Sequence, residues 1–253
     1  MLKKLGKVCE RESGTDWFAR LKSREFFYST GMPRLDEALE GGLRIKEILA
    51  VNGEESTGKT QLVWTILCEF LLNYKEDYVY YADFHRGLLP NRLREIIQSK
   101  NPNLNADDVK KLLKRVLYVE FNDEYDFWDF INNYSKLSQG RKAKLFIVEN
   151  VGSILGQTTI KYFRGEDREM QKKVMRGLRF FTQEHKVPII LTNHLSQNSY
   201  KPALGTFWNG QLPKNIYLSK EKGKYSMHYL KNEIPIAKLE FAIGAKGVVT
   251  LGS

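Results

Sequence analysis

Residues 48–60 read Ile-Leu-Ala-Val-Asn-Gly-Glu-Glu-Ser-Thr-Gly-Lys-Thr, and this stretch decides the fold. The apolar run at 48–51 predicts a buried strand, and residues 53–60 match the pattern Gly-x-x-x-x-Gly-Lys-Thr in full. Residues 61–72 carry apolar side chains at helical spacing. A strand that leads through a glycine-containing loop into a helix is the arrangement that holds nucleotide phosphates.

The residue types in this loop suit phosphate binding. Gly53 and Gly58 allow the backbone to approach the phosphates, Lys59 supplies positive charge to the β and γ phosphates, and Thr60 offers a hydroxyl to Mg²⁺. We therefore expect ATP and Mg²⁺ as ligands. The predicted nucleotide-binding residues are Gly53, Glu54, Glu55, Ser56, Thr57, Gly58, Lys59, Thr60 and Gln61.

A carboxylate from another strand should complete the magnesium site. The apolar run at 145–148 predicts that strand, and Glu149 follows at its end, where an acidic residue reaches the metal through water. Glu149 is one methylene longer than the aspartate usual at such a position, so we expect a displaced metal shell in which coordination survives and hydrolysis is impaired. The predicted metal-site residues are Thr60 and Glu149.

Strand and helix patterns alternate along the chain, which predicts an α/β fold. The final fifth instead contains short alternating segments at 215–220, 224–231 and 237–243. We expect a central, mostly parallel sheet flanked by helices, with a C-terminal antiparallel extension. Further strands are expected at 78–82, 116–120 and 188–192, and helices at 16–23, 35–39, 91–99, 126–138 and 168–184.

Length and composition limit the remaining possibilities. A chain of 253 residues with 42% hydrophobic residues can bury one sizeable core, so we expect a core at 25–253 and a leader at 1–24 that contacts a partner. Two cysteines are too few for a disulfide framework and indicate a reducing compartment. The formal charge of +10 favours polyanionic partners. No apolar run predicts secretion or a membrane span.

Several motifs together resemble one family, the RecA-type recombinases and their eukaryotic paralogs. STGMPRLDEALEGGL at 29–43, followed by GEESTGKTQL at 53–62, is similar to that family's approach to its phosphate loop. Thr192-Asn193-His194 resembles the family's Thr-Asn-Gln, whose glutamine senses the γ-phosphate, and FAIGAKGVV at 241–249 resembles its final strand and turn. The resemblance covers about residues 25–250 and implies a RecA-like P-loop ATPase core.

Within this family the chain resembles a small paralog, on the evidence of ESGTDWFARL at 12–21, Asp83-Phe84-His85 and Tyr200-Lys201-Pro202. That resemblance implies a nuclear protein that assembles with other recombinase paralogs in a hetero-oligomeric complex. Such a complex supports the strand-exchange filament on single-stranded DNA during homologous-recombination repair of double-strand breaks and damaged forks.

Three positions depart from an active recombinase. The family's water-orienting glutamate is replaced by His85 in one alignment register and by Asp83 in the other. Glu149 stands for aspartate, and His194 stands for the sensor glutamine. Loss of a water-positioning or charge-stabilising group costs orders of magnitude in rate. We expect ATP binding that serves assembly, with weak or absent ATPase activity.

Assembly is expected to differ as well. Only about two dozen residues precede the expected core, and they contain no Phe-x-x-Ala strand of the kind with which recombinases dock onto a neighbour. We expect an end subunit that accepts a partner's linker by strand addition at its sheet edge.

DNA contact is expected from residues 157–167, which occupy the place of the family's first DNA-binding loop. This segment holds Lys161, Tyr162, Phe163 and Arg164, a mixture suited to phosphate contact and base stacking on single-stranded or branched DNA. The basic run at 110–115 is interpreted as a solvated helix end. His185 and His228 are interpreted as structural.

Two other functions compete with the paralog hypothesis. The first is a self-sufficient DNA-dependent ATPase and strand-exchange enzyme, which the missing glutamate disfavours. The second is a small P-loop phosphoryl transferase, which would add lid arginines and an acceptor pocket to the phosphate loop.

Overall fold

The computed structural model describes residues 15, 26–137, 143–161, 166–195 and 202–252, so all of the expected leader except Thr15 lies outside the described residues. The expected α/β fold is confirmed. The strands are β1 (Phe27–Tyr28), β2 (Leu43–Arg44), β3 (Ile48–Gly53), β4 (Tyr78–Asp83), β5 (Val116–Glu120), β6 (Ala143–Glu149), β7 (Ile189–His194), β8 (Lys214–Glu221), β9 (Lys224–Lys231), β10 (Ile234–Gly244) and β11 (Gly247–Thr250). The helices are α2 (Pro33–Ala38), α3 (Lys59–Asn73), α4 (Pro90–Lys100), α5 (Ala106–Leu113), α6 (Glu124–Leu137), α7 (Val151–Lys161), α8 (Glu166–His185) and α9 (Gly205–Asn209).

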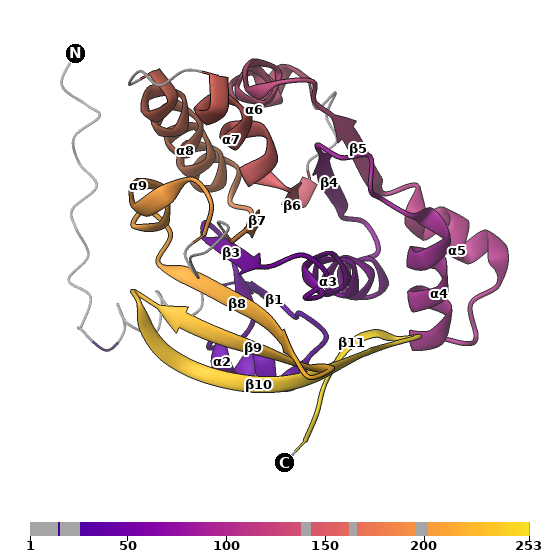
Figure 1. Cartoon of the computed structure of the whole chain (residues 1–253). Coiled ribbons are helices and arrows are strands. Elements are labelled where there is room, and N and C mark those ends of the chain that lie inside the picture. The colour runs from indigo at the N-terminus through magenta and orange to yellow at the C-terminus, as the bar shows by residue number, and fades with distance from the viewer. Residues whose placement is uncertain (1–14, 16–25, 138–142, 162–165, 196–201, 253) are drawn as a thin grey trace.

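The described strands form one nine-stranded sheet in the order β11-β10-β9-β8-β3-β7-β6-β4-β5, and β1 and β2 form a separate pair (Figure 1). Neighbouring strands from β8 to β5 run parallel, whereas β8 to β11 form an antiparallel meander. The predicted C-terminal extension is therefore confirmed. It continues the same sheet, because β8 is parallel to β3 and antiparallel to β9.

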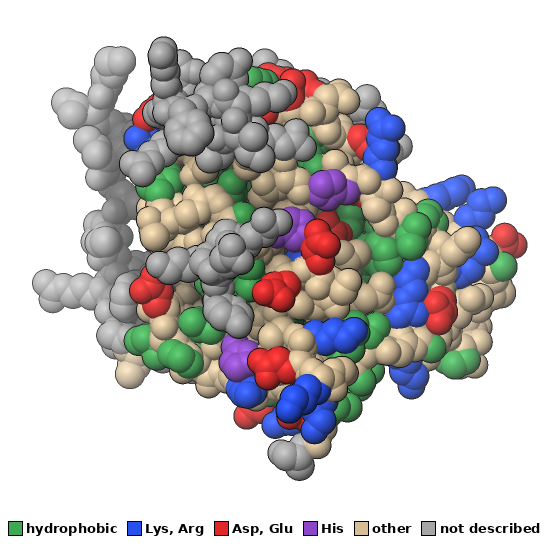
Figure 2. Space-filling model, viewed as in Figure 1, with side chains coloured by type: hydrophobic (Ala, Val, Ile, Leu, Met, Phe, Trp, Pro, Cys, Tyr) green, Lys and Arg blue, Asp and Glu red, His purple; other side chains and the backbone are tan. Residues whose placement is uncertain are grey.

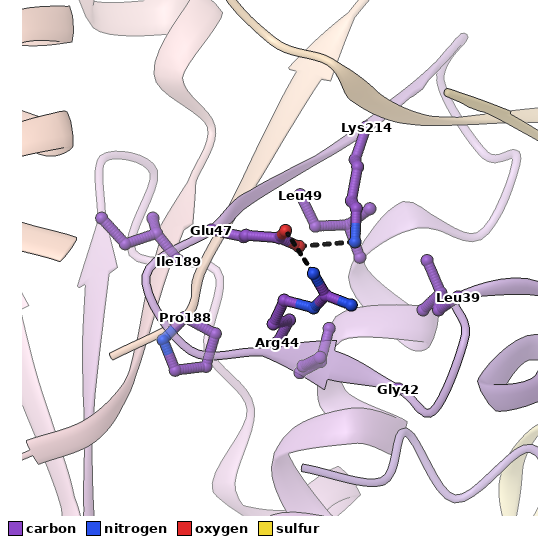
Figure 3. Close-up of a pocket in the computed structure, with 9 residues that line it drawn as sticks. Leu39, Gly42, Arg44, Glu47, Leu49, Pro188, Ile189 and Lys214 are labelled. Atoms are coloured by element: carbon purple, nitrogen blue, oxygen red, sulfur yellow. Dashed lines mark ion pairs between the residues drawn. The ribbon is translucent and has the colours of Figure 1, made fainter. Parts of the chain in front are cut away.

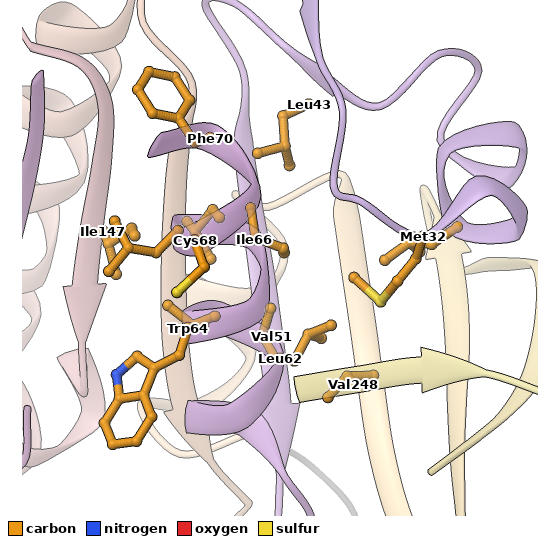
Figure 4. Close-up of a cluster of buried hydrophobic side chains, with 14 of the residues drawn as sticks. Met32, Leu43, Val51, Leu62, Trp64, Ile66, Cys68, Phe70, Ile147 and Val248 are labelled. Atoms are coloured by element: carbon orange, nitrogen blue, oxygen red, sulfur yellow. The ribbon is translucent and has the colours of Figure 1, made fainter. Parts of the chain in front are cut away.

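Helices cover the two faces of the parallel region. One hydrophobic cluster joins the sheet to α3, α4 and α5, and a second joins it to α6, α7 and α8. Helix α3 is apolar around most of its circumference, so it lies within the first cluster and not on its surface (Figure 4). Trp64, Cys68 and Phe70 are each at most 2% exposed. This burial holds the start of α3, and the loop before it, in a defined position.

The far end of α3 is closed by Arg115, which was expected in a solvated helix end. Lys110 and Lys114 are exposed as expected, but Arg115 is buried. Its guanidinium donates to the carbonyls of Leu71 and Tyr74, at the end of α3 where carbonyls lack partners within the helix. The sequence expectation was wrong for this residue, because a run of basic residues does not show which of them turns inward.

The end of the sheet opposite the phosphate loop contains a group of three charged residues (Figure 3). Lys214 at the start of β8 is 7% exposed, and its Nζ lies 2.5 Å from Glu47 Oε2. Arg44 Nη1 lies 3.8 Å from Glu47 Oε1. These ion pairs connect β2, β8 and the residue that precedes β3.

Helices α7 and α9 were not expected from the sequence, whereas α5 contains the helix end that was expected at 110–115. Helix α7 takes up part of the segment that was interpreted as a DNA-binding loop. Residues 157–161 are helical and not loop, and α8 begins at Glu166. None of the described helices combines the length and apolar composition needed to cross a membrane.

Candidate nucleotide site

The predicted phosphate loop connects β3 to α3 at the carboxyl edge of the parallel strands, where ligands of open α/β sheets bind. A pocket of about 420 Å³ lies there, within the range of roughly 300–1,000 Å³ common for small-molecule sites. Residues from β3, β4, β6 and β7 and the loops after them meet at this edge. The lining residues are Glu55, Ser56, Lys59, Thr60, Asp83, His85, Gly87, Glu149, Asn150, Thr192 and His194.

The two glycines of the loop are required by the local geometry. Gly58 precedes α3 with φ at 97°, a backbone conformation that favours glycine. A Cβ on Gly53 would lie 2.6 Å from Thr57 Oγ1 and 2.8 Å from the carbonyl of Leu218. By helix geometry, the first amide groups of α3 have no carbonyl partner within the helix, so they can bind an anion at this end. The loop therefore fits nucleotide phosphates.

Lys59 is directed back onto its own loop. Its Nζ donates to the carbonyls of Gly53 at 2.8 Å and Glu54 at 2.7 Å, and the residue is 8% exposed. Burial lowers the pKa of this ammonium group, and the nearby Glu149 carboxylate opposes that shift. A phosphate would offer Lys59 a full negative charge in place of two carbonyl oxygens.

The two predicted metal-site residues lie in direct contact. Thr60 donates a hydrogen bond from its hydroxyl to Glu149 Oε1, and Tyr81 donates to Glu149 Oε2. Burial raises the pKa of Glu149, while these two hydrogen bonds oppose the increase. A hydroxyl and a carboxylate beside a phosphate loop are the oxygen donors that a partly hydrated Mg²⁺ uses. The residues fit that ion, which when bound would neutralise phosphate charge.

The two alternatives for the missing glutamate occupy different positions. Asp83 is 2% exposed, and its carboxylate accepts from the amides of His85 at 2.9 Å and Leu88 at 3.0 Å. It thus holds the loop after β4. His85 is exposed at the pocket wall, and its Nε2 contacts Ser153 Oγ. Both residues line the pocket. The carboxylate of Asp83 is bound to its own loop, and His85 has no carboxylate.

His194 ends β7 directly beside Gly53 on β3. It is half-buried and lines the pocket together with Thr192. Burial, and next the positive charge of Lys59, lower the pKa of His194. The lowered pKa favours the neutral imidazole, which can donate one hydrogen bond and accept another. This is the position that the family resemblance assigns to the γ-phosphate-sensing glutamine.

The remaining predicted residues are more dispersed. Thr57 is 3% exposed and donates to the carbonyl of Glu54, so it stabilises the loop from within. Gln61 accepts from Arg92 Nε at 3.0 Å, and Arg92 also donates to the carbonyl of Gly244. Lys161 ends α7, where its side chain is not described. The other DNA candidates, Tyr162, Phe163 and Arg164, lie outside the described residues.

Tyr81 is the site residue that the sequence did not reveal. It lies inside β4, within a run that indicated only a buried strand. In register, Tyr81 pairs with Ile147 and Asp83 pairs with Glu149, so Tyr81 and Glu149 are diagonal neighbours on one face of the sheet. The available signal was that the predicted strand at 78–82, like the one at 145–148, is followed by an acidic residue. That pattern does not specify which strands lie side by side, or in which register.

Comparison with known proteins agrees with this architecture. A family model described as Rad51 matches residues 22–248. The chain is 24% identical to DNA repair protein RAD51 homolog 4 of Bos taurus, over 95% of this chain and 76% of that protein. It is 29% identical to DNA repair protein RAD51 homolog 2 of Homo sapiens, over 67% of this chain and 47% of that protein. It is 26% identical to meiotic recombination protein DMC1 of Saccharomyces cerevisiae, over 90% of this chain and 72% of that protein.

Proposed function

The chain belongs to the Rad51 family, and from that premise we propose that it is an ATP-binding recombinase paralog subunit that assists homologous-recombination repair of DNA. The observation that carries the proposal is the contact between Thr60 and Glu149 beside the loop of Gly53–Thr60. The same pocket contains Lys59 and His194, the side chains that would meet the phosphates. The names of its relatives place them in DNA repair and meiotic recombination.

ATP is the expected ligand, and slow or absent hydrolysis is the expected behaviour. Lys59 and the first amides of α3 would bind the phosphates, while Thr60 and Glu149 would hold the hydrated magnesium. An attacking water would need an oriented base. Asp83 binds the amides of His85 and Leu88 instead, and positions 85 and 194 carry imidazoles where an active recombinase has a water-orienting carboxylate and a sensor amide. These contacts support a nucleotide site that serves assembly.

A partner chain is proposed to add a strand along β5. Among the described strands β5 pairs with β4 alone, so its outer edge offers backbone groups to another chain. A groove of about 450 Å³ adjoins this edge, and exposed Tyr118 lies in its wall. The partners proposed are other recombinase paralogs. The position at the end of such an assembly remains a prediction.

Contact with single-stranded or branched DNA, in the nucleus, is proposed for the assembled protein. The excess of forty Lys and Arg over thirty Asp and Glu supports attraction to a polyanion. Figure 2 shows Lys and Arg side chains gathered over α4 and α5, where Arg94, Lys110 and Lys114 border one open pocket. The four DNA candidates, Lys161, Tyr162, Phe163 and Arg164, are proposed to add further contacts.

The test is to express the full chain alone and together with Rad51-family paralogs, and to measure solubility, co-purification and binding of a fluorescent ATP analogue. We expect a stable hetero-oligomer that binds Mg·ATP and turns it over slowly. Steady ATP hydrolysis by the chain alone, stimulated by single-stranded DNA, would identify a self-sufficient enzyme instead. Consumption of ATP only when a small acceptor is supplied would identify a phosphoryl transferase. A chain that binds neither nucleotide nor paralog contradicts the proposal.

A further inference from the structure

A buried chain of hydrogen bonds leads from the core to the candidate metal site. Trp64 on α3 donates from Nε1 to the hydroxyl of Tyr81 at 2.9 Å, and Tyr81 donates to Glu149 Oε2. Glu149 Oε1 accepts from Thr60. Trp64 is 2% exposed and Tyr81 is fully buried. The carboxylate is thus held at both oxygens, by one group on each side.

A glutamate needs such support more than an aspartate does. Its additional methylene adds a rotatable bond, so an unrestrained carboxylate would occupy several positions around the phosphate loop. Tyr81 is itself fixed, because its ring is enclosed in the core and its hydroxyl oxygen is bound by Trp64. Of the two protein groups on Glu149, Thr60 is the one that would turn toward the metal when nucleotide binds. Tyr81 is buried and is not among the lining residues of the pocket, so its contact with Glu149 would remain.

We propose that Tyr81 is a positioning residue, which holds the carboxylate of Glu149 at the magnesium side of the phosphate loop. The inference rests on the proposed function, since it concerns the same Mg·nucleotide site. Tyr81 does not touch the nucleotide, so it acts through Glu149 alone. Removal of its hydroxyl should therefore weaken the part of nucleotide binding that depends on magnesium and leave the metal-independent part intact.

The experiment compares binding of a fluorescent ATP analogue in Mg²⁺ with binding in EDTA, for the full chain. The wild-type ratio of the two affinities measures the contribution of the metal. Tyr81→Phe keeps the ring and should reduce this ratio on the order of tenfold, the size expected for one lost hydrogen bond to a charged group. The matched control is Tyr134→Phe, which removes another buried tyrosine hydroxyl, one that accepts from the amide of Ala143. It should leave the ratio unchanged.

Two further variants connect the effect to Glu149. In a Glu149→Gln background the additional change Tyr81→Phe should cause little further loss, because the charged partner is already absent. Trp64→Phe keeps the tyrosine hydroxyl but frees it to rotate, and should lower the ratio by a smaller factor. This variant also serves as the test if Tyr81→Phe does not fold.

The outcomes separate the inference from the function on which it rests. If the wild type binds Mg·nucleotide and neither Tyr81→Phe nor Trp64→Phe alters the ratio, Tyr81 is only a core residue and the inference is wrong. A loss of equal size in Mg²⁺ and EDTA also overturns it. If the wild type binds no nucleotide under either condition, the proposed nucleotide site fails, and the inference fails with it.

Discussion

The hydroxyl of Thr60 donates a hydrogen bond to Glu149, a residue 89 positions further along the chain. The contact joins the first turn of α3 to the end of β6. Both residues were predicted as metal-site residues from separate patterns in the sequence. Their contact gives these two predictions a common location.

Lys59→Ala should abolish tight nucleotide binding with little effect on folding. The ammonium group is largely buried, and among the described residues its hydrogen bonds go to two carbonyls of its own loop, so the fold gains little from it. Loss of its charge-assisted contacts should weaken ATP binding roughly 10- to 100-fold. Fluorescence titration with an ATP analogue and thermal unfolding provide the two measurements. The control is Lys110→Ala, which removes an exposed side chain of α5 and should bind the ATP analogue as the wild type does.

Arg115→Met should destabilise the protein far more than Lys114→Met. Arg115 is buried and donates to the carbonyls of Leu71, Tyr74 and Asp77, which would lose their donors. The expected loss in free energy of unfolding is about 2–3 kcal/mol. Lys114 is exposed, and its substitution should cost less than about 0.5 kcal/mol. Urea unfolding checks both values, and equal stabilities would contradict the capping role.

Lys214→Met and Glu47→Gln should have coupled effects on the free energy of unfolding. Lys214 is 7% exposed, whereas a third of Glu47 remains in contact with solvent, so their ion pair is partly screened. We expect each single change to cost roughly 1–2 kcal/mol, and a coupling energy of about 1 kcal/mol in the double-mutant cycle. Chemical denaturation of the wild type, both single variants and the double variant measures it. Additive effects would show that the contact at 2.5 Å contributes nothing to stability.

His194 should make the protein less stable as the pH falls below about 6.5. Its pKa is lowered in the folded chain, chiefly by burial. The unfolded chain therefore binds a proton at a higher pH than the folded chain, and acid favours unfolding. Between about pH 7.5 and about pH 5.5 the wild type should lose more stability than His194→Gln, a neutral variant that does not titrate. Thermal melts across this range test the difference. A larger loss in the variant would reverse the sign and contradict the assignment.

The local parts of the fold could be predicted from the sequence. The strand of residues 48–53, the loop after it and the helix that follows are contiguous in the chain. The residues that form the sequence motif are therefore the same residues that form the structure. The alternation in the last fifth of the chain likewise predicted the antiparallel strands that the structure contains. Helix α7 was not predicted, because its second half falls within residues 157–167, which were interpreted as a DNA-binding loop from the family resemblance.

The sequence alone determined the α/β class, and it predicted the phosphate loop and the groups that are proposed to meet a phosphate and a metal. Only the tertiary structure decided how those groups are supported. Tyr81 reaches Glu149 because β4 lies beside β6 in one register, and Arg115 turns inward because α3 ends next to it. These contacts join residues far apart in the chain. Their side chains find partners only when the sheet order and register are set, and periodicity along a single segment does not specify either.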